Sequence, residues 1–168
     1  MRWTQFYKLT IYVYDLANQK KLFLVKDRYG IKPLYYYNDE DKIVFASEVK
    51  ALEKSGLFAA EKNPQAMIGF LLFGSVPLPM TTIEGILAVP AGHYLVREAG
   101  GNQKIVKYYD ALDAFLKKSN DNFEAAKKKI RDLLEESARL HLISDAPLGV
   151  FLSGGLDSSA IAALSAEA

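Results

Sequence analysis

The chain contains no cysteine in its 168 residues. This excludes disulfide bonds, thiolate zinc sites and a thiol nucleophile within it. Charge of one sign is not in excess either, because 21 lysines and arginines stand against 20 aspartates and glutamates, so total charge does not indicate nucleic-acid binding. No apolar run approaches the ~18 residues of a membrane span, and no signal-peptide pattern follows Met1. We expect a cytoplasmic protein without nucleic-acid or membrane partners.

Histidine is scarce as well. His93 and His141 are the only two, they lie far apart in the sequence, and no carboxylate cluster accompanies either. A role in packing or at the surface is therefore favoured over metal ligation for both.

Short apolar segments joined by tight turns predict an antiparallel sheet in the first part of the chain. Half of all residues are hydrophobic, which is enough for a core. Ser47 is the expected cap of a helix over 48–55, and Asn63 with Pro64 opens a helix that ends at Gly74. The expected strands cover 9–14, 22–25, 34–37, 43–46, 93–97 and 105–109.

The pattern changes after residue 110. Residues 111–121 are polar without clear periodicity, which predicts a linker between a first domain at 1–110 and a second at 122–168. From Phe123, apolar residues recur at helical spacing. The apolar run 150–152 is typical of a buried strand in a parallel sheet.

The segment GVFLSGGLDSS, residues 149–159, predicts a strand, a glycine turn and a helix N-terminus in succession. Adjacent glycines let backbone N–H groups approach a ligand, and the first amides of a helix attract anions. Leu156 stands where a Walker loop needs lysine, and neither GxGxxG nor GxSxG is present. A phosphate site is therefore favoured over a turn that binds nothing.

Two motifs resemble known families. Residues 153–159 resemble the SGGxDS loop of the N-type ATP pyrophosphatases. DRYGIKPLY at 27–35, followed by FASEVKAL at 45–52, resembles the end of a class II glutamine amidotransferase domain. Lys26 stands where that domain usually has arginine, which weakens an expected ion pair. The two motifs in this order resemble the glutamine-hydrolysing asparagine synthetases.

The resemblance implies a fold and an activity. The fold would be the α+β antiparallel sandwich end of an amidotransferase domain, followed by the truncated start of an open α/β nucleotide domain with a parallel sheet. The enzyme family adenylates the side-chain carboxylate of aspartate with ATP and Mg²⁺. Formation of β-aspartyl-AMP releases pyrophosphate. Ammonia from glutamine travels through an internal tunnel and attacks this intermediate, and AMP is released.

The resemblance also assigns site residues. Ser153, Gly154, Gly155 and Ser158 would hold the pyrophosphate end of ATP, and Ser159 would do so more loosely. Asp157 would bind Mg²⁺, unless it only caps the helix. The expected ATP-site residues are Leu152 (through its backbone, to adenine), Ser153, Gly154, Gly155, Asp157, Ser158 and Ser159.

Some family features are not expected in this chain. The family's catalytic cysteine directly follows the initiator methionine, and residues 1–8 resemble neither that start nor the glutamine-binding segment. Few residues follow the loop, so we expect a fragment of a larger enzyme that is inactive alone. Three alternatives remain: a β-lactam-synthetase-like or other related ligase, a non-catalytic interaction module, and a serine hydrolase in which Ser153 uses a histidine. The oligomeric state is left open.

Overall fold

The computed structural model describes residues 11–15 and 20–167. The chain divides into two compact units, Met1–Lys117 and Lys118–Ala168. None of the helices within the described ranges is long and apolar enough to cross a membrane.

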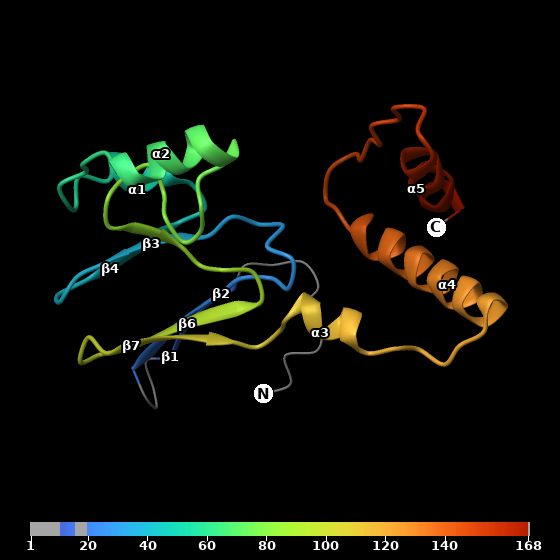
Figure 1. Ribbon diagram of the computed structural model, residues 1–168, viewed down its shortest axis with the longest axis horizontal. Helices are drawn as coiled ribbons and strands as arrows, with labels where there is room; N and C mark the ends of the chain where they lie inside the picture. The colour runs from blue at the N-terminus through green and yellow to red at the C-terminus, as the bar shows by residue number, and fades with distance from the viewer. Residues whose placement is uncertain (1–10, 16–19, 168) are drawn as a thin grey trace. The chain divides into compact units, whose positions relative to one another are not determined.

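The first unit contains two antiparallel sheets (Figure 1). Every pair of neighbouring strands is antiparallel, which confirms the expected sheet type. The four-stranded sheet has the order β1 (Ile11–Asp15), β2 (Lys21–Val25), β6 (His93–Glu98) and β7 (Gln103–Lys107). The three-stranded sheet has the order β4 (Ile43–Ala46), β3 (Tyr35–Asn38) and β5 (Ile86–Ala88).

Alternation along the central strand β3 explains how the unit packs. Tyr36 is 2% exposed and lies in the core between the sheets with Leu24 and Leu95. Its neighbours Tyr35 and Tyr37 pack on the opposite side, in a cluster centred on Leu52, Ile83 and Ile86. Because successive strand residues point to opposite faces, one short strand serves both cores. The result is a sandwich with α1 (Val49–Lys54) packed against the outer face of β3 and β4.

The helices of the first unit follow the capping rules in part. Asn63 accepts a hydrogen bond from the Ala66 amide at 3.1 Å and starts α2 (Pro64–Phe73), which ends at Gly74 in the left-handed conformation, as predicted. The predicted cap of α1 is wrong. Glu48, not Ser47, occupies the N-cap position, and its side chain makes no capping hydrogen bond.

The segment expected to be a linker contains a short helix. Asp110 accepts a hydrogen bond from the Leu112 amide at 2.9 Å and caps α3 (Ala111–Leu116). No residue of α3 is buried. Leu112, Phe115 and Leu116 recur at helical spacing, so the predicted linker overlooked a capped helix whose apolar residues remain exposed.

Arg97 ties the two sheets together. Its side chain is 8% exposed and comes from β6 of the four-stranded sheet. The guanidinium donates to the carbonyl oxygens of Asp39, Lys42 and Glu40, at 3.1, 2.9 and 3.1 Å, in the turn between β3 and β4. The buried cation is thereby satisfied by three backbone carbonyls, of which that of Lys42 also accepts the Asp39 amide at 3.1 Å.

The second unit consists of α4 (Phe123–His141) and α5 (Leu156–Glu167), which pack against each other. Asn122 caps α4 through the Ala125 amide at 2.9 Å. Arg131 of α4 bonds Glu135 at 2.6 Å and lies 3.7 Å from Glu167 of α5.

The strand predicted at residues 150–152 is wrong for this structure. The segment has no regular secondary structure, and Phe151 is 99% exposed. A parallel strand needs neighbours to pair its backbone groups. The described part of the second unit contains only helices and connecting segments, so it offers no such neighbour.

Gly92 provides a test of the packing in the first unit. Its φ is +67°, and a Cβ added there would overlap the carbonyl oxygen of Tyr109. Gly56 has a nearly identical φ of +66° but open space around it. Gly56→Ala should cost only the left-handed strain of about 1–2 kcal/mol. We expect Gly92→Ala to cost at least about 3 kcal/mol in urea unfolding, since steric overlap adds to that strain. Equal losses would contradict the close approach at Gly92.

Candidate functional site

The seven predicted site residues lie together in the turn before α5 and in its first helical turn. Gly154 has a φ of +77°, a conformation that favours glycine, and no atom lies within 4 Å of an added Cβ. The Oγ atoms of Ser153 and Ser158 are 3.0 Å apart. Ser158 also donates to the carbonyl oxygen of Gly155 at 3.1 Å. The loop therefore brings two hydroxyls and a glycine turn to one place.

Helix α5 begins directly after the glycine turn, so its free amides lie beside the loop. The Ser159 amide donates to the Gly155 carbonyl at 3.1 Å, the first bond of the α-helical pattern. The amides that precede Ser159 have no partner one turn back within the helix. They carry partial positive charge at the N-terminus of a twelve-residue helix. The loop is exposed, apart from the half-buried Ser158.

Asp157 lies within the first turn of α5, one residue past its start. A capping aspartate would precede the helix and accept a hydrogen bond from an amide. In the described part of the chain, the carboxylate of Asp157 has neither a hydrogen-bond donor nor an ion-pair partner. The described residues hold no cluster of three or more metal-ligating side chains, so a metal here would depend on one carboxylate and on the ligand.

The histidines are engaged elsewhere. The Nδ1 atom of His141 pairs with the Ser137 carbonyl at 2.8 Å, and that of His93 with the Ala91 carbonyl at 2.7 Å. Among described residues, the hydrogen-bond partner of the Ser153 hydroxyl is another serine. A serine nucleophile needs a general base within reach, which this arrangement does not provide.

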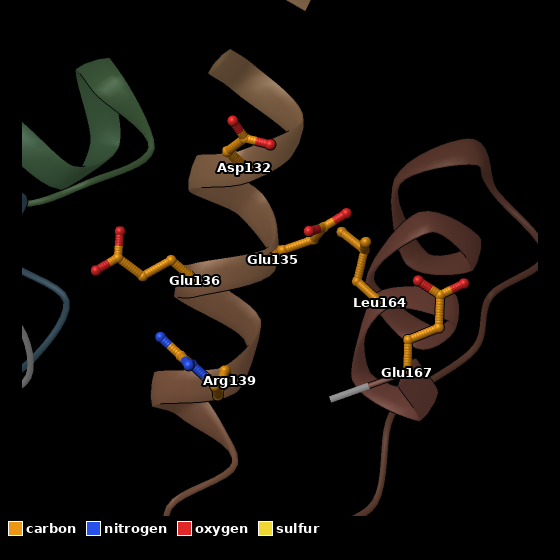
Figure 2. A pocket seen from close by; sticks show the side chains of 6 residues that line it. All are labelled: Asp132, Glu135, Glu136, Arg139, Leu164 and Glu167. Atoms are coloured by element: carbon orange, nitrogen blue, oxygen red, sulfur yellow. The ribbon is translucent and has the colours of Figure 1, made fainter. Parts of the chain in front are cut away.

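Two hollows flank α4 and α5. The first has a volume of about 430 Å³ and is lined largely by apolar residues, including Ala138, Leu148 and Ile161. The second, of about 460 Å³, is shown in Figure 2. Its lining consists of Asp132, Glu135, Glu136, Arg139, Leu164 and Glu167. Four carboxylates against one guanidinium make this second hollow unsuitable for a phosphate chain.

The motif DRYGIKPLY in the first unit is organised by Asp27, which is 8% exposed. Its Oδ1 accepts hydrogen bonds from the amides of Tyr29 and Ile31 at 3.1 and 3.0 Å, and its Oδ2 from that of Lys32 at 3.1 Å. Burial alone would raise the pKa of Asp27, but hydrogen bonds from the backbone outweigh it and hold the pKa below its ordinary value. These contacts support a structural role for the motif.

Sequence reasoning missed the tyrosines that complete this region. The hydroxyl of Tyr108 donates to the Lys26 carbonyl at 2.6 Å. The hydroxyls of Tyr29 and Tyr109 are 2.9 Å apart, and the Arg28 guanidinium lies 5.4 Å from the centre of the Tyr109 ring. These partners are about eighty positions apart in the chain, so no local pattern indicates them.

Asp27→Asn tests the role of the carboxylate. We expect a loss of about 1–3 kcal/mol in unfolding free energy at neutral pH, because an amide offers one acceptor oxygen for three donors. The folded-state pKa is lowered, so the stabilisation is present above the unfolded pKa of about 3.9 and lost as pH falls through the folded value. Between pH 7 and pH 2, the melting temperature of the parent chain should therefore fall more steeply than that of Asp27→Asn.

Asp41→Asn is the matched control, because Asp41 is exposed and its carboxylate has no hydrogen bond among the described residues. Its unfolding free energy should change by less than about 0.5 kcal/mol. Parallel curves of melting temperature against pH for the parent chain and Asp27→Asn below pH 4 would contradict the stabilising role of the Asp27 carboxylate.

The comparisons with known proteins match both halves of the chain. Residues 7–109 match the glutamine amidotransferase domain family, and residues 129–168 match the asparagine synthase family. The chain is 33% identical to asparagine synthetase [glutamine-hydrolyzing] 2 of Bacillus subtilis over 167 residues, which is 94% of this chain and 22% of that protein.

Two further relatives show similar coverage. Asparagine synthetase [glutamine-hydrolyzing] 1 of Bacillus subtilis is 33% identical over 89% of this chain and 23% of its own length. Amidase chry2 of Gibberella zeae is 34% identical over 88% of this chain and 22% of its own length. The chain thus spans less than a quarter of these relatives. It belongs to the asparagine synthetase family, with a glutamine amidotransferase segment followed by an asparagine synthase segment.

Proposed function

We propose that this chain is part of an ATP-dependent amidoligase, which makes asparagine from aspartate with ammonia derived from glutamine. The observation that carries the proposal is the loop before α5, where a left-handed glycine, two converging hydroxyls and a helix N-terminus meet at the surface. Amide and hydroxyl donors at a helix start suit the oxygens of a phosphate chain. Family membership supports the same assignment.

The chemistry explains why such an enzyme needs a phosphate loop. A carboxylate reacts poorly with ammonia until one of its oxygens becomes part of a good leaving group. Transfer of the adenylyl group from ATP achieves this and releases pyrophosphate, and ammonia then displaces AMP. We assign the amides of Gly154 and Gly155 and the hydroxyls of Ser153 and Ser158 to the pyrophosphate, with Ser159 in support and the Leu152 backbone at the adenine.

The hydroxyl pair must rearrange when a phosphate binds. Ser158 donates its proton to the Gly155 carbonyl, so Ser153 is left to donate to Ser158. In that state neither proton is available to a ligand oxygen. Rotation of the two side chains about χ1 would release both protons, and the open surface around the loop leaves room for it.

Asp157 fits a magnesium ion that arrives with the nucleotide. Mg²⁺ prefers oxygen ligands and is often held by one or two carboxylates, the substrate phosphates and water. One exposed carboxylate without a partner among the described residues meets this requirement. When bound, the ion would neutralise the negative charge that develops on the departing pyrophosphate.

Asp157→Asn separates metal binding from helix capping. We expect the 168-residue chain to bind pyrophosphate more tightly with Mg²⁺ than without it in calorimetric titrations. Asp157→Asn should weaken binding about tenfold or more in the presence of Mg²⁺, because the ion loses a charged ligand, and little in its absence.

Asp145→Asn, which changes an exposed carboxylate ahead of the loop, should leave both affinities unchanged. If Asp157 only stabilises the helix, Asn should be nearly silent in both titrations, since the two residues cap helices equally well. No pyrophosphate binding by the parent chain would instead favour a non-catalytic interaction module.

The absence of cysteine predicts that this chain releases no glutamate from glutamine. Glutamine hydrolysis in the class II amidotransferases uses a thiol nucleophile, and no other residue type in the chain substitutes for it in this chemistry. A coupled glutamate dehydrogenase assay should give the rate of a buffer blank. Glutamate release that co-purifies with the chain and persists after rechromatography would contradict this expectation.

A second candidate differs in the acceptor substrate. The chain is as similar to amidase chry2 as to the asparagine synthetases, so the activated carboxylate need not belong to aspartate. A β-lactam-synthetase-like or other related ligase would use the same phosphate loop. ATP–pyrophosphate exchange by the protein that carries this chain, with aspartate and with other carboxylic acids in turn, distinguishes them by which acid supports exchange.

A further inference from the structure

Helix α2 of the first unit carries apolar side chains all around its axis, although it lies at the surface. Residues 64–83, which include the whole helix, contain no charged side chain. Ala66 and Gly69 are its buried residues and mark the side that faces the unit. Six large apolar side chains of the helix are 47–80% exposed: Met67, Ile68, Phe70, Leu71, Leu72 and Phe73. A surface helix usually turns polar residues to water, so the outer side of α2 is unusual.

The spacing of these residues creates an apolar face opposite the buried side. At 3.6 residues per turn, Met67, Ile68 and Leu71 lie within about 60° of the direction opposite Ala66 and Gly69. Leu72 adjoins them, and we call these four exposed side chains the α2 face. The helix lies in the layer that α1 forms beside the three-stranded sheet (Figure 1).

The segment that carries α2 is held firmly where it leaves and re-enters the unit. The Asn63 amide donates to the Thr82 carbonyl at 2.9 Å, which closes the base of the segment. A Cβ added to Gly69 would lie 2.5 Å from the Cδ of Pro77, so the returning loop packs directly on the helix. The α2 face is therefore preformed, which lowers the entropy cost of binding a partner.

The exposed apolar area is large for a monomer. The six side chains together expose roughly 600 Å², on the scale of about 150–250 Å² for one large aromatic side chain. The largest apolar patch of a typical monomer is about 300–600 Å², and one partner of a standard interface buries about 800 Å². The helix therefore supplies most of the area that a small specific interface needs from one partner.

We propose that the α2 face binds the same face of a second copy of this chain in a two-fold symmetric contact. In such a contact each patch meets its own copy, so a charged patch would place like charges together, and an uncharged patch avoids that repulsion. Antiparallel helices also align their dipoles favourably. The contact involves no residue of the phosphate loop, so it goes beyond the proposed function and can fail independently of it.

A membrane surface suits α2 less well than a second copy does. Helices that lie in a membrane interface usually carry lysine or arginine on a polar face, which anionic lipids attract. Residues 64–83 supply neither. An apolar patch with aromatic residues and methionine and without charge is instead typical of the centre of a protein–protein interface.

Sedimentation equilibrium of the 168-residue chain tests the contact. We expect a monomer–dimer equilibrium with a micromolar dissociation constant, because the patch lies at the small end of specific interfaces. Leu71→Glu should weaken dimerisation about tenfold or more, because the contact would then bury an unpaired charge. Leu71 is largely exposed in the monomer, so the melting temperature of the dilute chain should stay unchanged.

A charge exchange shows whether α2 meets α2. Leu71→Lys should weaken dimerisation as Leu71→Glu does, and an equimolar mixture of the two variants should dimerise more tightly than either alone, because opposite charges then meet across the axis. Phe115→Glu in α3 and Phe151→Glu in the second unit are the controls, since both side chains are even more exposed than Leu71. Neither control should change the dissociation constant.

A chain that stays monomeric at every concentration would overturn the proposal. Flotation of that monomer with phospholipid vesicles, lost in Leu71→Glu, would then assign the α2 face to a membrane. Protection of α2 from amide exchange only in a longer protein that carries this chain would assign it to another part of that protein. A dimer that Leu71→Glu leaves intact, that mixing the two variants does not restore, or that a control weakens equally would exclude the two-fold contact through α2.

Discussion

The carboxylate of Asp27 accepts hydrogen bonds from three backbone amides in the turn after β2, and much of the first unit depends on this turn. The carbonyl of the same residue accepts the amides of Gly30 and Gly92, at 3.2 and 2.9 Å. Gly92 in turn accepts the amides of Tyr108 and Tyr109. One residue therefore connects the exit of β2, the entry to β6 and the segment after β7. An uncharged side chain could not satisfy as many donors in so little space.

The candidate phosphate site places its donors at the surface. The loop before α5 is exposed, so in the proposed function a phosphate would replace the water that hydrates its donors. Affinity in that case would come from several weak donors and a helix N-terminus that converge on one anion. Such an exposed arrangement would cost little stability when empty.

Several elements could be predicted because short stretches of sequence encode them. Short apolar runs indicated β2 and β4, and Asn63, Pro64 and Gly74 marked both ends of α2. The predicted cap of α1 failed by a single position, because Glu48 and not Ser47 directly precedes the helix. The other failures depend on distant partners. Residues 150–152 have strand-like composition but no neighbouring strand in the described second unit. Arg97 could not be recognised because the carbonyls it binds are more than fifty residues away.

The sequence by itself determined the type of chemistry. The order SGGLDSS specifies a glycine turn, two hydroxyls and a carboxylate at a helix start, because all of these act within seven residues. Only the tertiary structure decided which polar groups are already used and which remain available. Asp27 is saturated by its own turn and Arg97 by a turn of the other sheet, whereas the carboxylate of Asp157 has no partner among the described residues. These differences arise from burial and from contacts across strands, which depend on register and packing and not on neighbours in sequence.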